Sequence, residues 1–262
     1  MFFINLNGNK NRKKIGVILV IISLLFALGF IAVHLTSKYM KFLTVVPRSR
    51  LLSVTGGISV AYIFVHILPE LKEHQDILHE GETFKNFFLS EHHVYLFAMI
   101  GLVIFYGLER MVMVSKKRNE RKRDKHHAGA GAFWIHILAF CVYNALIGYL
   151  LVRGESKEFT EMGLYFFALA LHFISNDHSL RETHKQSYDQ YGRWLLSFSI
   201  FLGWGFGMIE EVSEAAIAIL FSFLAGGVVL NVLKEELPEE RDSNFWAFSA
   251  GVILYTSLLL LI

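Results

Sequence analysis

Residues 162–180, MGLYFFALALHFISNDHSL, form an apolar run long enough to cross a bilayer as a helix. The run carries His172, Asn176, Asp177 and His178 inside it or at its end. An aspartate at the centre of a membrane helix costs roughly 2.5–3.5 kcal/mol on insertion scales, so such residues usually face a bundle interior or a wet cavity. His172 and Asn176 are four residues apart and share one helix face. This polar face is where we expect the function of the protein to lie.

The composition places the chain among polytopic α-helical membrane proteins. It has 262 residues, of which 54% are apolar, with 24 Phe and only three Pro. Several apolar runs of about 20 residues match the length of a transmembrane helix, whereas a membrane β-barrel would show short alternating segments. The single cysteine, Cys141, excludes an intramolecular disulfide. We expect the chain to lie in the lipid bilayer and to bind no nucleic acid.

The hydrophobic runs predict one membrane domain over residues 1–262. The expected fold class is an all-α integral membrane protein, a bundle of eight transmembrane helices. The first, third, fourth and eighth spans are the clearest by hydropathy, and the sixth is short. The predicted spans are residues 15–35, 51–71, 94–113, 133–152, 162–180, 194–209, 215–233 and 245–262.

The distribution of Lys and Arg between the loops predicts the orientation in the membrane. Cytoplasmic loops of membrane proteins carry the excess of positive charge. Both termini are therefore predicted outside, in the plasma membrane or the inner membrane of a bacterium. Four loops together carry twice as many Lys and Arg residues as the N-terminal tail and the remaining loops. These four basic loops are residues 36–50, 114–132, 181–193 and 234–244.

Two loops contain histidines that leave a second interpretation open. The basic loop at 114–132 is interpreted as a solvated topology determinant at the cytoplasmic face, with metal sensing by His126 and His127 as the alternative. The acidic segment 70–93 contains four histidines and is interpreted as an ordinary polar loop, with cation collection as its alternative. Neither loop shows the ligand spacing typical of a zinc site.

Depth in the membrane groups the polar residues of the fourth and fifth predicted spans. At a rise of about 1.5 Å per residue, Tyr143, Asn144 and His172 fall near the middle of the bilayer. His136 and Asp177 each lie about three residues from the cytoplasmic end of their span and form a second matched pair. Because a short loop joins the two spans, we expect them to be adjacent and antiparallel, with these side chains facing one another.

Glycines in three spans predict close helix packing. Gly203 and Gly207 form a small-xxx-small pair, and Gly56–Gly57 and Gly226–Gly227 permit backbone contact elsewhere. An unwound or hinge segment is the alternative interpretation. The sequence leaves open whether the tight helix pair forms within one subunit or between the two subunits of a homodimer.

Several stretches resemble the ZIP (ZRT/IRT-like) family of metal transporters. Residues 66–70, His-Ile-Leu-Pro-Glu, are similar to the family's His-Leu-Leu-Pro-Glu at the end of the second span. Residues 226–238, GGVVLNVLKEELP, resemble its Gly-rich seventh span, and a basic loop with histidines lies between spans three and four as in the family. The resemblance covers most of residues 50–262 and implies the ZIP transporter fold with both termini outside.

The resemblance extends in part to the family's metal-binding motifs. The fourth span of the family reads His-Asn-x-x-Asp/Glu-Gly; here Tyr143 and Ile147 replace the His and the acid, while Asn144 and Gly148 match. The fifth span keeps a first histidine and a final acid. The side chains predicted to contact the metal are His172, Asp177, Asn176, Asn144, Tyr143 and His136.

These observations predict a divalent cation transporter of the zinc, iron and manganese class, which moves its ion along the polar face between spans four and five. The alternative is a protein with the ZIP fold that has lost transport and acts as an interaction or regulatory subunit. The same polar residues also suit a proton relay or a structural hydrogen-bond network. An intramembrane zinc hydrolase would need at least three strong ligands at one depth, so neither enzymatic activity nor a resident cofactor is predicted.

Overall fold

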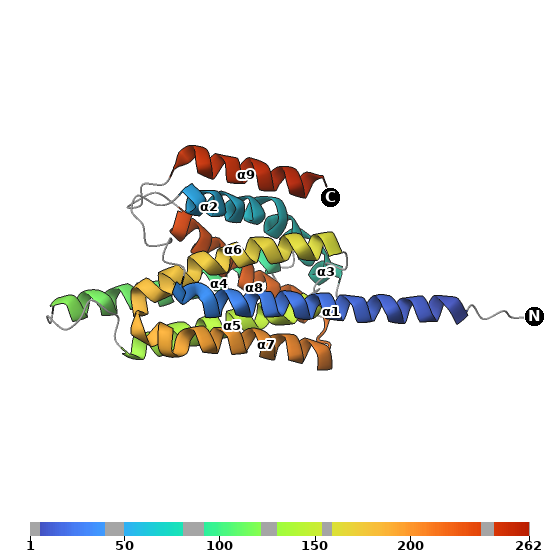
Figure 1. Cartoon of the computed structure of the whole chain (residues 1–262), viewed down its shortest axis with the longest axis horizontal. Helices are drawn as coiled ribbons and strands as arrows, with labels where there is room; N and C mark the ends of the chain where they lie inside the picture. The colour runs from blue at the N-terminus through green and yellow to red at the C-terminus, as the bar shows by residue number, and fades with distance from the viewer. Residues whose placement is uncertain are drawn as a thin grey trace, which may run out of the picture.

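The protein is an all-α membrane protein. The computed structural model describes residues 6–39, 50–80, 92–121, 130–153, 159–236 and 244–261. The helices run along one long axis, and those that follow each other are antiparallel, except that α3 continues α2 (Figure 1). The described elements are α1 (Leu6–Thr36), η1 (Ser37–Tyr39), α2 (Arg50–Tyr62), η3 (Ile63–Ile67), α3 (Leu68–Glu80), α4 (His93–Arg121), α5 (Ala130–Arg153), α6 (Phe159–His184), η5 (Tyr188–Gly192), α7 (Arg193–Ile209), α8 (Glu214–Glu236) and α9 (Phe245–Leu260).

Within the described residues, five segments are long and apolar enough to cross a membrane. They match predicted spans one to four and seven. The other three predicted spans correspond to α6, α7 and α9, the last of which has 16 residues. The five segments are Ile18–Tyr39, Ser53–His79, His93–Arg118, Gly131–Arg153 and Glu214–Lys234.

Three helices extend furthest beyond the predicted spans. α1 begins at Leu6 rather than at residue 15, and α4 continues to Arg121 through part of the predicted basic loop. The helix of the second span continues through η3 and α3 to Glu80, into the predicted acidic loop. Lys, Arg, Glu and Gln are good helix formers, so helix continues into these polar segments. The parts of the two loops outside the described residues are 81–91 and 122–129, which includes His126 and His127.

The described helices divide into two groups by their packing. α5 packs most extensively on α7, and α1 packs on α7 and α6, which makes one group. α2 packs on α9 and α4 on α8, while α3 also contacts α8, which makes the other. In Figure 1, α9 lies beside α2 at one edge and α7 beside α5 at the opposite edge. Contacts of α6 with α2 and of α5 with α4 join the two groups.

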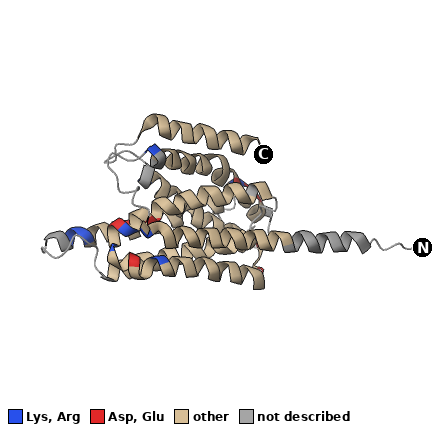
Figure 2. Ribbon diagram, viewed as in Figure 1, with Lys and Arg blue, Asp and Glu red and all other residues tan. Residues whose placement is uncertain are grey.

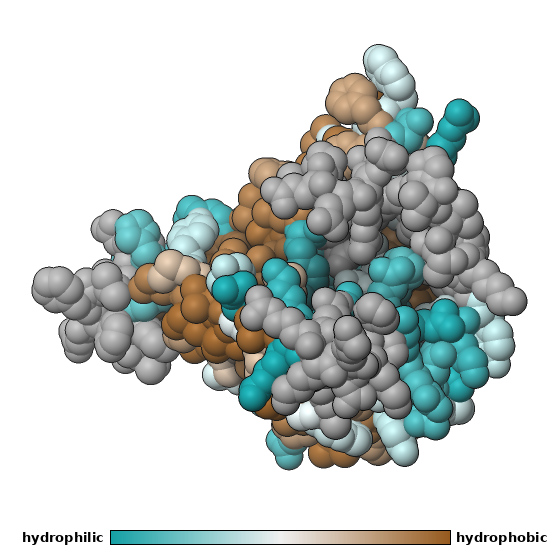
Figure 3. Space-filling model, turned by 90° about the vertical axis from the view of Figure 1, so that its left-hand side faces the viewer, coloured by the Kyte–Doolittle hydropathy of each residue, from teal (hydrophilic) through white to brown (hydrophobic). Residues whose placement is uncertain are grey.

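The surface changes from apolar sides to polar ends. Figure 2 shows Lys, Arg, Asp and Glu mostly towards the two ends of the bundle. Large apolar side chains are exposed along the sides, among them Leu25, Ile104, Leu138 and Phe198. The end in Figure 3 carries hydrophilic side chains over its face and hydrophobic ones on its flank. Apolar sides between polar ends are expected where helices cross a lipid bilayer.

Reciprocal glycine contacts hold α5 and α7 close together. A Cβ on Gly203 of α7 would overlap the carbonyl oxygen of Ala145 in α5. In the other direction, a Cβ on Gly148 of α5 would overlap the carbonyl oxygen of Ile200 in α7. The predicted packing role of Gly203 is therefore confirmed, and its helix pair forms within one subunit rather than between two.

The same arrangement joins two further helix pairs. α4 and α8 approach each other through Gly101 and Gly226, and α2 and α9 through Gly57 and Gly251. At each of these positions a Cβ would overlap a backbone carbonyl oxygen of the partner helix. Since lipid is as apolar as a leucine side chain, such close backbone packing is a main source of helix association in membranes.

We expect Gly203→Ala to destabilise the protein by about 2 kcal/mol, because α5 must move to admit the new methyl group. The matched control is Gly205→Ala on the same helix, where a Cβ meets no atom within 4 Å. Thermal unfolding in detergent should show a lower midpoint for Gly203→Ala and an unchanged or higher one for Gly205→Ala. Equal shifts for the two variants would contradict this account of the α5–α7 contact.

Candidate functional site

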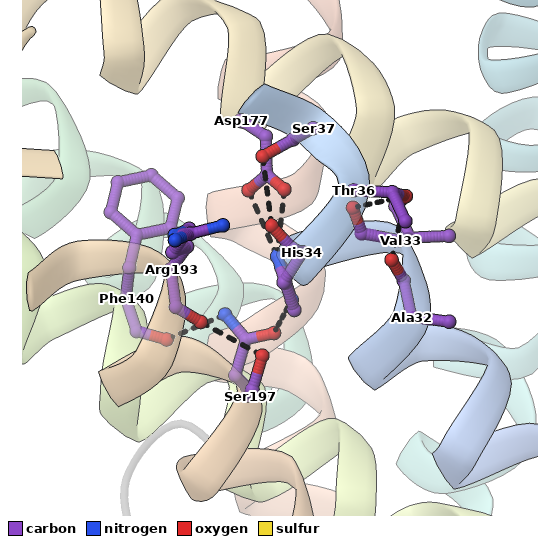
Figure 4. A network of polar contacts seen from close by, with 10 residues as sticks. Ala32, Val33, His34, Thr36, Ser37, Phe140, Asp177, Arg193 and Ser197 are labelled. Carbon is purple, nitrogen blue, oxygen red and sulfur yellow. Dashed lines mark hydrogen bonds and ion pairs between the residues drawn. The ribbon is translucent and has the colours of Figure 1, made fainter. Parts of the chain in front are cut away.

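A histidine of the first helix, His34, joins two of the predicted site residues. Its Nδ1 atom lies 2.9 Å from each carboxylate oxygen of Asp177 in α6, and its Nε2 atom lies 2.9 Å from Oδ1 of Asn144 in α5. All three side chains are buried, and those of His34 and Asp177 have no exposed surface. Figure 4 shows the imidazole facing both oxygens of the carboxylate. We call His34, Asp177 and Asn144 the His34 cluster.

The position of α1 corrects the predicted contact between spans four and five. These spans are α5 and α6, and α1 packs against both, while the backbones of α5 and α6 approach each other at few points. At Asn144 and Asp177, the face predicted to carry the transported ion is therefore occupied by His34 of α1. The physical reason is that Asp177 and Asn144 are buried polar groups, which need hydrogen-bond partners. His34 supplies a partner for both.

The contacts of His34 with Asn144 and Asp177 require a proton on each side of its ring. Asn144 donates from Nδ2 to the carbonyl oxygen of Phe140 at 2.8 Å, which directs its Oδ1 atom towards Nε2 of His34. Turning the amide over would bring two oxygen atoms together at that distance, so Oδ1 accepts and Nε2 donates. On the other side, Nδ1 shares a second proton with the carboxylate of Asp177.

The His34 cluster therefore holds one proton more than a neutral imidazole beside an ionised carboxylate. Whether this proton is on Nδ1 or on a carboxylate oxygen, the cluster has no net charge. An uncompensated charge is expensive to bury, so the neutral form suits a site without exposed surface. Loss of the proton would leave a buried negative charge on the cluster.

Protic and charged side chains border the His34 cluster where α6 turns into α7. Burial, together with the nearby carboxylate of Asp177, raises the pKa of the Tyr188 phenol in η5 well above its ordinary value, so this phenol stays neutral. Arg193 of α7 donates from Nη1 to the carbonyl oxygen of Leu35 at 3.1 Å. The hydroxyl of Ser37 donates to the carbonyl oxygen of His34 at 2.8 Å. These two bonds satisfy carbonyl groups at the end of α1 that lack helical partners.

The structure brings together only some of the predicted metal-binding residues. Tyr143 and His172 meet as predicted, with their ring centroids 6.2 Å apart. His136 and Asp177, predicted as a second pair, do not pair, since Asp177 binds His34 and His136 binds side chains of α4 and α6. Equal depth in the membrane does not determine the direction in which each side chain leaves its helix, and the predicted pairing was wrong for that reason.

His136 belongs to a second polar cluster, which we call the Glu109 cluster: Glu109, His136, His184 and Lys234. Nδ1 of His136 lies 3.0 Å from Nε2 of His184, and its Nε2 atom lies 3.3 Å from a carboxylate oxygen of Glu109. Nζ of Lys234 lies 2.8 Å from the other oxygen of Glu109. These contacts link α4, α5, α6 and α8 and compensate the charge of a carboxylate that is only 17% exposed.

The described side chains bind one another rather than surround a metal position. Among the described residues, no three His, Cys, Asp or Glu side chains are placed to hold one metal ion. Zinc sites use about four donors, and the carboxylates of Asp177 and Glu109 already have partners in their clusters. Asn176, which precedes Asp177 in the sequence, is also buried. Its Nδ2 atom has no hydrogen-bond partner in the described part of the chain.

The residues at the centre of both clusters are not among the predicted site residues. His34 lies near the end of the first apolar run, and Glu109 lies near the end of the third. An ionisable residue within a membrane span is by default a candidate for a functional role, and that signal would have selected both. It would not have identified the partners, because Asp177 lies 143 positions from His34 along the chain.

Comparison with known proteins identifies no relative of this chain. No protein-family model matches the sequence, and no curated protein matches it. The resemblance to the ZIP family therefore rests on the residues quoted above and stays a prediction.

We expect His34→Leu to lower the free energy of unfolding by about 3–5 kcal/mol, because it leaves the Asp177 carboxylate buried without a partner. The double variant His34→Leu/Asp177→Leu removes both polar groups and should be markedly more stable than the single one. Thermal unfolding in detergent measures both. The control is Lys72→Ala, which breaks an exposed ion pair with Asp76 and should leave the midpoint almost unchanged. Additive losses in the double variant would contradict the pairing.

Proposed function

We propose that the protein is a membrane transporter that takes up and releases a proton at the His34 cluster. The observation that carries the proposal is the hydrogen-bond arrangement of His34, whose two ring nitrogens both face acceptor oxygens. The acceptors come from α5 and α6 and the imidazole from α1, so the protonation of the cluster affects contacts among three helices. Ionisable residues inside a membrane bundle are rare and usually serve ion or proton movement.

Stability by itself does not account for the His34 cluster. A buried ion pair is often no more stabilising than well-packed apolar side chains of similar size, because removing two charges from water is costly. The pair therefore adds little that leucines could not supply in the same bundle. A role in holding and releasing a proton explains why Asp177 and His34 occupy a position without exposed surface.

Release of the proton changes the contacts between helices. Without it, either Nε2 of His34 presents a lone pair to Oδ1 of Asn144, or Asp177 loses the hydrogen bond from Nδ1. Each alternative weakens one contact of α1, with α5 in the first case and with α6 in the second. Proton loss is thereby coupled to the arrangement of three helices, and a bistable arrangement of this kind is what transport requires.

The cargo is a separate proposal that rests on the family resemblance. That resemblance indicates divalent cations of the zinc, iron and manganese class. The described side chains do not form a ligand set for it, so no residue is assigned to metal binding.

Proton movement into liposomes that contain the purified protein tests the proposal. The liposomes are given an inside-negative potential, and the assay is run both without metal and with zinc, iron(II) or manganese outside. The wild-type protein should acidify the interior in at least one of these conditions. Asp177→Asn keeps the shape and an acceptor for Nδ1 of His34 but cannot hold a proton, so the rate should fall at least about tenfold. Lys72→Ala, in the exposed pair with Asp76, is the control and should transport like the wild type.

A folded wild-type protein that moves no proton under any of these conditions contradicts the proposal. The interaction or regulatory subunit would then be the better interpretation, with the His34 cluster serving only to position α1. Metal uptake without proton movement would support the predicted cargo and overturn the proton coupling.

A further inference from the structure

We propose that a relay of buried phenols and an imidazole, namely Tyr62, Tyr165, Tyr143 and His172, carries protons between the partly exposed pair His66–Glu70 and the His34 cluster. The inference rests on the proposed function, which it extends by naming the route that the proton takes. It involves residues from η3, α3, α2, α6 and α5, which meet between the two helix groups.

The outer end of the relay is the pair His66–Glu70. Nε2 of His66 lies 3.3 Å from a carboxylate oxygen of Glu70, and the two side chains are 29% and 19% exposed. Both residues therefore reach the surface of the bundle while remaining in contact with its interior. A carboxylate and an imidazole in contact can pass a proton from one to the other.

A π-helical turn shapes the backbone that carries His66. Leu68 donates from its backbone N–H to the carbonyl oxygen of Ile63, five residues earlier, which defines the wide turn η3. Pro69 follows directly, and its ring has no N–H and clashes with the carbonyl group four residues before it. The wide turn accommodates the proline, as π-bulges in helices often do at functional sites.

The relay continues inward through two tyrosines. The ring of Tyr62 stacks on His66 with centroids 5.0 Å apart, and the rings of Tyr62 and Tyr165 lie 6.4 Å apart. The carboxylate of Glu70 interacts electrostatically with both phenols. Tyr165 interacts in turn with Tyr143 on α5. Ring contacts thus join His66, Tyr62 and Tyr165 in series.

The last step reaches the His34 cluster. The rings of Tyr143 and His172 lie 6.2 Å apart, and Tyr143 precedes Asn144 of the cluster in sequence. One helical turn beyond His172, the buried amide of Asn176 precedes Asp177, the other partner of His34. The relay therefore ends on α5 and α6, the two helices that supply the partners of His34.

Buried hydrogen-bonding groups without a partner among the described residues lie along this route. The phenol oxygens of Tyr143 and Tyr165 are buried and have no hydrogen-bond partner within the described residues, as is the case for Nδ2 of Asn176. A buried polar group without a partner costs about 1–3 kcal/mol, so native proteins rarely keep one without a bound water or a function. Three such groups along one path indicate that they bind water molecules that bridge them.

Proton transfer along these groups balances at every step. A phenol accepts a proton on an oxygen lone pair and gives up its own proton to the next acceptor, so no phenolate remains. His172 accepts on one ring nitrogen and releases from the other. At the inner end the proton is taken by the His34–Asp177 pair, and at the outer end it is supplied by His66, Glu70 or water.

The rate at which the ring N–H protons of His34 exchange with D2O tests the route directly, by NMR of histidine-labelled protein in detergent. His34→Gln identifies the signals. We expect Tyr143→Phe and Tyr165→Phe each to slow the exchange at least about fivefold. Their unfolding midpoints should not fall, because neither hydroxyl has a hydrogen-bond partner within the described residues.

The matched control is Tyr255→Phe. Tyr255 lies in the same aromatic group, with its ring 6.4 Å from Tyr62, but its hydroxyl donates to the carbonyl oxygen of Leu164 at 2.9 Å. Removing that hydroxyl should lower the unfolding midpoint slightly and leave the exchange rate unchanged. The control thus separates loss of a structural hydrogen bond from loss of a relay group.

The outcomes separate the relay from the proposed function. Unchanged exchange in both Tyr143→Phe and Tyr165→Phe overturns the relay, even if Asp177→Asn abolishes proton movement in liposomes. Slow exchange in these variants supports the relay whether or not the wild-type protein transports under the conditions of the liposome assay. A fall in the unfolding midpoint of both variants, with exchange unaffected, would assign the phenols a structural role instead.

Discussion

The hydrogen bonds on both sides of the His34 ring determine the position of the first helix. One bond reaches Asp177 on α6 and the other reaches Asn144 on α5, so α1 can occupy only one place between them. A carboxylate and an amide in an apolar interior cannot remain unpaired without a large loss of free energy. This constraint separates α5 from α6, although a short connection joins them, and it places an ionisable group inside the bundle.

Two different kinds of contact hold the helices together. Glycines bring α5 to α7, α4 to α8 and α2 to α9, with the backbones of each pair in close contact. The His34 and Glu109 clusters add contacts between ionisable side chains of different pairs, and Lys234 also joins α8 to Glu109 of α4. The bundle thus combines close backbone packing within helix pairs with polar side-chain contacts between them.

The departures from the ZIP pattern agree with the hydrogen-bond arrangement. Tyr143 stands where the family motif has a histidine, and its ring lies 6.2 Å from that of His172. Ile147 stands where the family has an acid and is fully buried in the hydrophobic core. Asn144, which matches the family, serves as the acceptor for His34. A resemblance in sequence therefore does not carry the chemistry of the site with it.

Much of the fold followed from the sequence. The run 162–180 and its counterparts predicted an all-α membrane protein, because only helices and closed barrels satisfy backbone hydrogen bonds in lipid. The glycines predicted close packing, since a missing Cβ permits backbone contact in any partner arrangement. Helix ends were less accurate: α4 continues to Arg121, because charged residues with high helix propensity do not stop a helix when it leaves the membrane.

The candidate site depended on tertiary structure. Hydropathy and spacing identified Asp177, Asn144 and His172 as buried polar residues, because their cost in lipid is a property of each residue alone. Which partner each one has is a property of how helices rotate and pack, and depth along a span carries no information on rotation. The sequence alone therefore determined that polar groups lie inside the bundle, while only the packing of α1 between α5 and α6 decided that His34 binds Asp177 and Asn144.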